Sequence, residues 1–407
     1  MKKVSFSILF SIFLNFCLAQ QVTTVAGSNS GFNEGNGVLA KFSFPTGVFS
    51  DAAGNLYVAD ENNNRIRKIT PDGMVTTFAG SGLSGSTNGP GATARFSSPH
   101  GLCVDTSGNV YVAERLSNRI RKITPDGTVS TFATGFQNPY GICIDTNGIL
   151  YVADTYNHKI KKITPQGVVT TLAGSTNDYQ DGQGINAAFS YPEGICVDAA
   201  GNVFVADYQS HKVRKITPTG YVSTVAGTTI GYQDGDGITA KFNYPAGITV
   251  DSLGNLYVAE EYNHTIRKID TNGVVSTFAG TTGGYLDGQA TVAKFYQPCG
   301  VYVDASDIIY VADQSNHKIR KIIQERLSVN NNSLADLSVY PNPASQKLTI
   351  QLPNTIQIQK VTIYNTLGQL IKTENKKEIN VSDLSKGSYF LKIDTDKGSA
   401  TKAFIVQ

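Results

Sequence analysis

The sequence predicts an all-β protein, a six-bladed β-propeller followed by a small C-terminal β-sandwich. Its main sign is a segment present six times, each copy pairing a P-x-G stretch with a VA(D/E) stretch. A period of 40 to 54 residues indicates a solenoid or a propeller. Composition agrees, because 40 glycines, 20 tyrosines and 19 phenylalanines suit short, turn-rich strands. The acidic residues that end the second stretch are Asp60, Glu114, Asp154, Asp207, Glu260 and Asp313.

Each repeat contains four expected strands, which the fifth copy illustrates. Residues 247–251 and 256–260 are apolar runs, joined by a turn in which Gly254 permits positive φ. The second run is apolar on both faces, which indicates a strand between two packed layers. Residues 265–269 carry mixed charge and residues 274–280 form a more polar outer strand. Four strands joined by tight turns make one propeller blade.

The sixth repeat lacks an outer strand, because its third strand runs directly into residues 323–327. A stretch with the outer-strand pattern stands alone at residues 22–27 instead. We therefore expect the N-terminal strand to complete blade six, so that the ring closes without a long unpaired edge.

The first 19 residues are expected to be a signal peptide. Lys2 and Lys3 precede an apolar stretch, and Cys17-Leu18-Ala19 resembles a cleavage signal. Nothing in the mature chain is long and apolar enough to predict a membrane span. A net charge of +2 gives no reason to expect a nucleic-acid partner. Although export permits disulfides, cysteines at one repeated position should lie too far apart to pair, so we expect free buried thiols at Cys103, Cys143 and Cys196.

With these residues in view, the chain resembles NHL-repeat β-propellers. The family's Asn-His-Leu motif follows VA(D/E) here as Asn-His in three copies, ending at His158, His264 and His317, and in weaker form elsewhere. The resemblance implies a propeller over about three hundred residues. It does not imply one function, because the family includes scaffolds, RNA binders and a few metal enzymes.

The repeated polar residues have structural and functional interpretations. Histidines at one repeated turn suggest a ring of ligands, but turns at equal radius lie too far apart to share one ion. We expect hydrogen bonds at each turn, and a structural role for the six acidic residues as well. The basic third strands, such as the one containing Arg65 and Arg67, are expected to be solvated surface strands.

Long connections between repeats carry a second motif, a tyrosine followed by Asp-Gly. These Asp-Gly loops suggest calcium binding, yet their spacing differs from an EF-hand loop, which favours structural turns. They remain candidate contact residues on one face of the propeller. The candidates are Tyr179, Asp181, Tyr232, Asp234, Tyr285 and Asp287.

The residue between Pro and Gly at the start of each first strand varies, although the repeats agree nearly everywhere else. A ligand site at the propeller axis would have this pattern. The side chains of His100, Glu193 and Cys299 offer metal-ligand chemistry. We expect no resident cofactor, with calcium or another divalent ion at the axis as the alternative. The six axial residues are Thr46, His100, Tyr140, Glu193, Ala246 and Cys299.

A different pattern begins after a polar linker at residues 328–335. Residues 336–407 contain short strands and turns, which suggest a small β-sandwich. The segment resembles the type A C-terminal sorting domain of the type IX secretion system, which implies export across both membranes and contact with that machinery. The residues that carry the resemblance include Tyr340, Pro341, Asn342, Pro343, Gly368, Gly387, Tyr389 and Lys402.

Together these features predict a secreted or cell-surface protein with a propeller at residues 20–327. We expect a monomeric, non-catalytic scaffold that binds a glycan, a peptide or a protein. The alternative is a secreted metal-dependent hydrolase or lyase with its site at the axis. No Ser-His-Asp order, paired-carboxylate motif or phosphate loop is present.

Overall fold

The computed structural model describes residues 18–326, 337–352, 356–366, 369–396 and 398–407. Most of the expected signal peptide, the expected linker and Gly368 lie outside the described residues. The chain divides into two compact units, Gln21–Ile323 and a C-terminal unit from Gln324. Among the described residues, no helix has the length and hydropathy needed to cross a membrane.

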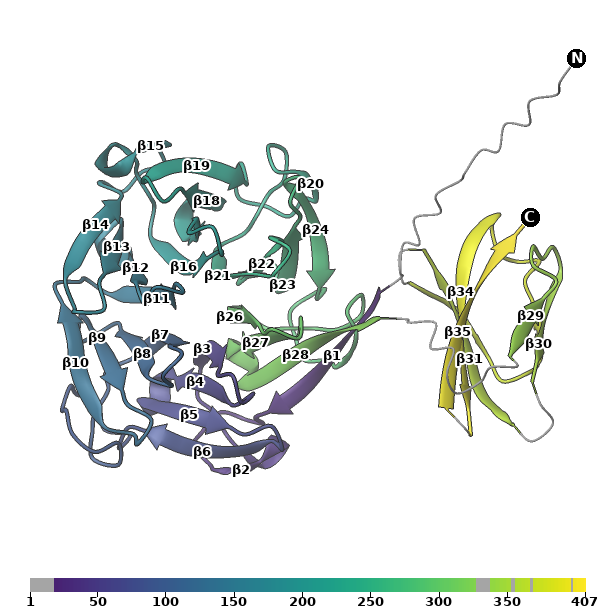
Figure 1. The fold of residues 1–407 in the computed structure, drawn as a ribbon, viewed down its shortest axis with the longest axis horizontal. Coiled ribbons are helices and arrows are strands. Elements are labelled where there is room, and N and C mark those ends of the chain that lie inside the picture. The colour runs from purple at the N-terminus through teal and green to yellow at the C-terminus, as the bar shows by residue number, and fades with distance from the viewer. Residues whose placement is uncertain (1–17, 327–336, 353–355, 367–368, 397) are drawn as a thin grey trace, which may run out of the picture. The chain divides into compact units, whose positions relative to one another are not determined.

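The larger unit consists of six antiparallel sheets, numbered here along the chain (Figure 1). Sheet 1 contains β2 (Gly35–Asn36), β3 (Pro45–Ser50), β4 (Leu56–Asp60), β5 (Arg65–Ile69) and β6 (Met74–Ala79). Sheet 2 contains β7 (Pro99–Val104), β8 (Val110–Glu114), β9 (Arg119–Ile123) and β10 (Val129–Thr134). Sheet 3 contains β11 (Pro139–Ile144), β12 (Leu150–Asp154), β13 (Lys159–Ile163) and β14 (Val169–Ala173).

The other three sheets repeat this order. Sheet 4 contains β15 (Gly182–Gln183), β16 (Pro192–Val197), β17 (Val203–Asp207), β18 (Lys212–Ile216) and β19 (Tyr221–Ala226). Sheet 5 contains β20 (Gly235–Asp236), β21 (Pro245–Val250), β22 (Leu256–Glu260), β23 (Thr265–Ile269) and β24 (Val274–Ala279). Sheet 6 contains β25 (Gly288–Gln289), β26 (Pro298–Val303), β27 (Ile309–Asp313), β28 (Lys318–Arg326) and β1 (Leu18–Ala26).

Short 3-10 turns lie between some strands. Two of them, η1 (Gly37–Leu39) and η4 (Gly184–Asn186), follow the small outer strands β2 and β15. The other four follow the second strand of a sheet: η2 (Glu61–Asn63), η3 (Thr155–Asn157), η5 (Tyr208–Ser210) and η6 (Gln314–Asn316).

The sheets close into a ring. The first strands β3, β7, β11, β16, β21 and β26 lie innermost, and each contacts the next, with β26 returning to β3 (Figure 1). Within sheet 6, β1 lies between β25 and β28. The N-terminal strand thus completes the last sheet, as the sequence predicts.

The core lies between neighbouring sheets. Five of the six second strands are buried along their whole length, as expected for strands apolar on both faces, and in β27 only Tyr310 is partly exposed. The A-x-F segments before the first strands each insert a fully buried phenylalanine, such as Phe42 and Phe242. Cys103, Cys143, Cys196 and Cys299 are free and buried, which confirms the three thiols predicted.

The C-terminal unit contains two further sheets. One has the order β29 (Ser338–Tyr340), β30 (Lys347–Gln351) and β33 (Glu378–Asn380). The other has the order β32 (Leu370–Glu374), β31 (Ile358–Asn365), β34 (Gly387–Thr395) and β35 (Gly398–Val406). Their buried apolar residues form one core that includes Leu348, Ile363, Leu391 and Phe404.

Candidate functional site at the propeller axis

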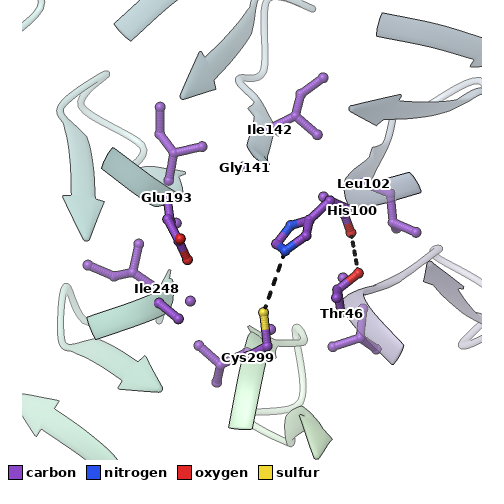
Figure 2. A pocket seen from close by; sticks show the side chains of 17 residues that line it. Thr46, His100, Leu102, Gly141, Ile142, Glu193, Ile248 and Cys299 are labelled. Carbon is purple, nitrogen blue, oxygen red and sulfur yellow. Dashed lines mark hydrogen bonds between the residues drawn. The ribbon is translucent and has the colours of Figure 1, made fainter. Parts of the chain in front are cut away.

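The six innermost strands bring their variable residues together at one place. The glycine after each variable residue permits this close approach, because a Cβ at Gly194 would lie 2.2 Å from the carbonyl oxygen of Ala246. The result is a cavity of about 80 Å³, which we call the axial cavity (Figure 2). The residues that line it include five of the six predicted axial residues: Thr46, His100, Glu193, Ala246 and Cys299. The sixth, Tyr140, is not a lining residue, although Gly141 of the same strand is.

One wall of the axial cavity is formed by His100 and Cys299. The imidazole Nε2 of His100 lies 3.9 Å from the Sγ atom of Cys299, and the two residues are 8% and 7% exposed. Burial lowers the pKa of His100 to about 3, assisted by the charge of Arg115. Burial also raises the pKa of the Cys299 thiol well above its usual value. Both shifts favour the uncharged forms of the pair, a neutral imidazole beside a neutral thiol.

Glu193 lies across the cavity from this pair, with its carboxylate directed inward (Figure 2). No described residue donates a hydrogen bond to that carboxylate or forms an ion pair with it. Burial raises the pKa of Glu193 well above its usual value, and the charges of Glu261 and Glu61 contribute in the same direction.

Sequence reasoning missed a second set of variable residues at the same end of the ring. The residue that follows each VA(D/E) stretch approaches the start of the next innermost strand. Thr155, for example, donates a hydrogen bond to the Pro192 carbonyl at 2.7 Å. The signal was present, because this position also differs in all but one pair of repeats. We call this set the axial rim, made of Glu61, Arg115, Thr155, Tyr208, Glu261 and Gln314.

The charged rim residues have specific partners. Arg115 forms an ion pair with Glu61 at 2.9 Å, and Ser98 donates to the same carboxylate oxygen at 2.5 Å. The hydroxyl of Tyr208 donates to Glu261 at 2.5 Å. Burial raises the pKa of both glutamates and of Tyr208. The guanidinium of Arg115 also lies 4.7 Å from the ring centre of Tyr140, which places Tyr140 beside the cavity entrance.

The aspartates of the Asp-Gly loops have partners within the protein. Asp181, Asp234 and Asp287 form ion pairs of 2.5 to 2.7 Å with fully buried arginines of third strands. Each aspartate also accepts a hydrogen bond from the backbone of an outer strand, and Asp287 accepts that bond from Thr24 of the closing strand β1. The carboxylates are therefore engaged within the protein. Tyr179, Tyr232 and Tyr285 remain 59%, 55% and 47% exposed.

The prediction of solvated basic third strands is wrong for their central arginines. Five arginines are fully buried, and each forms an ion pair with the acidic residue that ends the VA(D/E) stretch of its own sheet, as Arg67 does with Asp60 at 2.9 Å. The carboxylates need this partner because they are also fully buried. The arginines are Arg67, Arg121, Arg214, Arg267 and Arg320.

The repeated turns join neighbouring sheets. The Nδ1 atom of His211 accepts a hydrogen bond from the backbone N–H of Tyr244 at 3.2 Å, and His158, His264 and His317 do the same in their sheets. Asn64 and Asn118 replace the imidazole with a side-chain oxygen. The expected structural hydrogen bonds are present: in five sheets the Asn or Ser of the turn donates to the turn's own carboxylate, as Asn157 does to Asp154 at 2.7 Å, while the imidazole joins the turn to the next sheet.

The donor set does not form a metal centre by itself. Within the described ranges, no group of three or more His, Cys, Asp or Glu side chains is arranged to hold a metal ion. His100 and Cys299 are the only two potential ligands of the axial cavity whose side chains are in contact.

The sorting-motif residues lie in the C-terminal unit. Asn342 accepts a hydrogen bond from the backbone N–H of Ile405 at 2.9 Å and donates to the carbonyl of Ala403 at 3.1 Å, which ties the motif to β35. Tyr389 stacks on Phe404 and donates to the Ser385 carbonyl. Pro341 and Pro343 flank Asn342, while Gly387 begins β34 and Lys402 lies in β35.

Comparison with family models identifies three kinds of region. The secretion system C-terminal sorting domain matches residues 338–407. The NHL repeat matches residues 42–69, 96–123 and 242–269. The SMP-30/gluconolactonase/LRE-like region matches residues 132–230.

Comparison with curated proteins gives distant relatives. NHL repeat-containing protein 2 of Homo sapiens is 28% identical over 402 residues, covering 92% of this chain and 51% of the human protein. Protein SUPPRESSOR OF QUENCHING 1 of Arabidopsis thaliana is 30% identical over 319 residues, covering 73% of this chain and 26% of the plant protein. The chain therefore spans about half the length or less of these relatives.

Solved structures share the fold. A protein of unknown function from Bacteroides thetaiotaomicron has a TM-score of 0.63 at 23% identity, covering 76% of each chain. An auxiliary nutrient binding protein of the same organism has a TM-score of 0.62 at 19% identity, covering 76% of this chain and 77% of that one. The sorting domain indicates export by type IX secretion to the cell surface or outside. This chain carries NHL repeats ahead of a secretion system C-terminal sorting domain, and it is homologous to NHL repeat-containing proteins.

Proposed function

We propose that the protein is an exported binding scaffold whose ligand, a glycan, a peptide or a protein, contacts the axial face. In this proposal residues 20–327 form one six-bladed propeller, one blade for each sheet. Residues 328–335 link it to a β-sandwich at residues 336–407, which delivers the monomer to the type IX machinery. The signal peptide at residues 1–19 is removed.

The observation that carries the proposal is where the six repeats differ. Buried ion pairs and inter-sheet hydrogen bonds recur around the ring, while the residues of the axial cavity and axial rim differ among the sheets. A framework that required no ligand would have no reason to vary at one end of the axis. The auxiliary nutrient binding protein is a protein of this fold that binds.

The proposal is tested by binding to glycan and peptide arrays. We expect the mature chain to bind a defined class of probes, and the double variant Glu193→Gln/Glu261→Gln to lose that binding. Glu378→Gln is the matched control, because it removes a carboxylate from an exposed ion pair with Lys347 in the C-terminal unit. Equal binding by the double variant and the wild type would contradict an axial contact surface.

The alternative is a metal-dependent hydrolase or lyase, which one observation favours. The axial cavity brings an imidazole, a carboxylate and a thiol to its wall, and each is a ligand for a divalent transition metal. Elemental analysis separates the two functions.

A further inference from the structure

The axial cavity offers hydrogen-bond acceptors and lacks a free cationic donor. Glu193 points into the cavity without a partner among the described residues. His100 is 8% exposed, its ring is hydrogen-bonded to the backbone of Tyr140, and its Nε2 atom lies 3.9 Å from the thiol of Cys299, which is a weak partner. The nearby cation Arg115 is held by Glu61. A ligand that fills these acceptors must donate hydrogen bonds.

The charge at the cavity entrance favours a cation. Glu61 is neutralised by Arg115, but neither Glu193 nor Glu261 forms an ion pair with any described lysine or arginine. Glu261 accepts a hydrogen bond from the neutral hydroxyl of Tyr208. The two carboxylates repel one another, since each raises the cost of ionising the other. A bound cation would remove this repulsion.

A row of tyrosine rings begins at Tyr208 of the axial rim. Tyr208 lies 4.7 Å from Tyr244, which lies 4.9 Å from Tyr262, both measured between ring centres. Tyr140, on the innermost strand that packs against the strand of Glu193, already carries Arg115 over its face. Aromatic faces offer apolar surface to the carbon chain of a ligand.

The size of the cavity limits what enters it. Drug-sized ligands occupy pockets of about 300–1,000 Å³, whereas the axial cavity holds about 80 Å³. A charged head group fits, while a sugar ring or an aromatic side chain must remain over the tyrosines.

We propose that the axial cavity binds the ammonium group of an organic amine, with its three N–H donors directed to Glu193 and His100 and its carbon chain lying over Tyr208, Tyr244 and Tyr262. This inference rests on the proposed binding function and names its ligand class. An ammonium group has three donors and no acceptor, which matches a wall made of acceptors.

Binding should also release protons. Glu193 faces Glu61, Glu261, Arg115 and Tyr208 of the axial rim, together with His100, Cys299 and Tyr140 of the innermost strands. Burial and the charges of Glu261 and Glu61 raise the pKa of Glu193, while an ammonium ion favours the carboxylate form, so binding and deprotonation are linked. Affinity should therefore increase with pH until Glu193 is ionised.

The test is isothermal titration calorimetry of the full mature chain with n-butylammonium, with 1-butanol as the neutral probe of equal length. We expect n-butylammonium to bind and 1-butanol to give no heat. Glu193→Gln should weaken binding at least tenfold and abolish proton release, measured as the dependence of the heat on buffer ionisation. Glu261→Gln should weaken binding less, and Glu378→Gln should leave it unchanged.

Two further probes distinguish the source of the amine. Nα-acetyl-lysine methylamide represents a peptide side chain, and glucosamine represents an amino sugar. Stronger binding of either identifies the source and supports the proposal.

Equal binding of 1-butanol, or unchanged affinity in Glu193→Gln, would overturn it. If no amine binds while the arrays still detect a ligand that depends on the axial face, the ammonium inference fails and the scaffold function stands. If both experiments fail, the function fails too.

Discussion

The VA(D/E) residues lie in fully buried polar clusters that hold each sheet together. Asp207 accepts a bond from Arg214 at 2.8 Å, and the same guanidinium reaches Asp181 and the carbonyl of Ala188. One arginine thus connects the second strand, the third strand and the loop that enters the sheet. In sheet 3 this role is filled by Lys161, which is bonded to Asp154 at 2.9 Å.

Removing one member of such a pair should destabilise the protein strongly. We expect Arg214→Met to lower the free energy of unfolding by about 3–5 kcal/mol, because Asp207 would remain buried without a cation. Arg214→Lys should cost less, since the chain itself uses lysine in sheet 3. Chemical denaturation followed by circular dichroism measures both, and equal losses would contradict the role of the charge.

The inter-sheet hydrogen bond of the histidine turns should depend on its acceptor. His211→Ala removes the bond to Tyr244 and places an alanine at φ 56°, so we expect a loss of about 2 kcal/mol. His211→Asn copies Asn64 and Asn118, which have the same left-handed backbone and make the same bond. Denaturation midpoints should therefore differ between the two variants, and equal destabilisation would count against this bond.

These turns also predict a dependence of stability on pH. Burial lowers the pKa of His158, His211, His264 and His317 in the folded state below the usual value of about 6.5. The unfolded state then binds more protons, so the histidine contribution is present above pH 6.5 and is lost as the pH falls below it.

The measurement compares the wild type with the variant in which all four histidines become asparagine. Between pH 7.5 and pH 5.5 the free energy of unfolding should fall more in the wild type. The comparison is necessary because burial raises the pKa of Asp207 to about 6, which acts in the opposite sense. Parallel pH profiles would refute the prediction.

At the scale of elements, the sequence was sufficient to predict the strands and the closure of the ring. The repeats have a fixed order of apolar runs and turns, which specifies the strands directly. The last repeat lacks an outer strand and the N-terminal segment has that pattern, which indicates that the N-terminal strand pairs with the last sheet. The burial of Arg67 and its equivalents was not predictable from composition, because the Asp-Gly loops that cover them are distant in sequence. The axial rim was missed because each of its residues directly follows a repeated acidic residue, and the sequence interpretation considered only that acidic residue.

Strand β1 should contribute to stability out of proportion to its length. Val22 and Ala26 are fully buried, and β1 covers the edge of β28. Deleting residues 20–27 should lower the melting temperature by roughly 10 °C, since several kcal/mol of apolar burial are lost. Val22→Asp should act in the same direction, while Met74→Asp on the exposed outer strand β6 serves as the control. An unchanged melting temperature after the deletion would contradict closure by β1.

At the scale of the whole molecule, the proposed function assigns export to the C-terminal unit and binding to the larger unit. Removing residues 336–407 should leave the protein in the periplasm, because the remaining chain keeps the predicted signal peptide but lacks the sorting domain. Fractionation with immunoblotting measures this, and Glu378→Gln in the same unit is the control. Normal secretion of the truncated chain would show that another signal directs export.

The central claim is that the axial face binds a ligand without catalysing a reaction at a resident metal. Elemental analysis of the purified mature chain, beside His100→Ala and Glu193→Ala, tests it most directly. The account predicts no tightly bound ion in any of the three proteins. One ion per chain, lost in both variants, would contradict the account and identify the axial cavity as the centre of a metal enzyme.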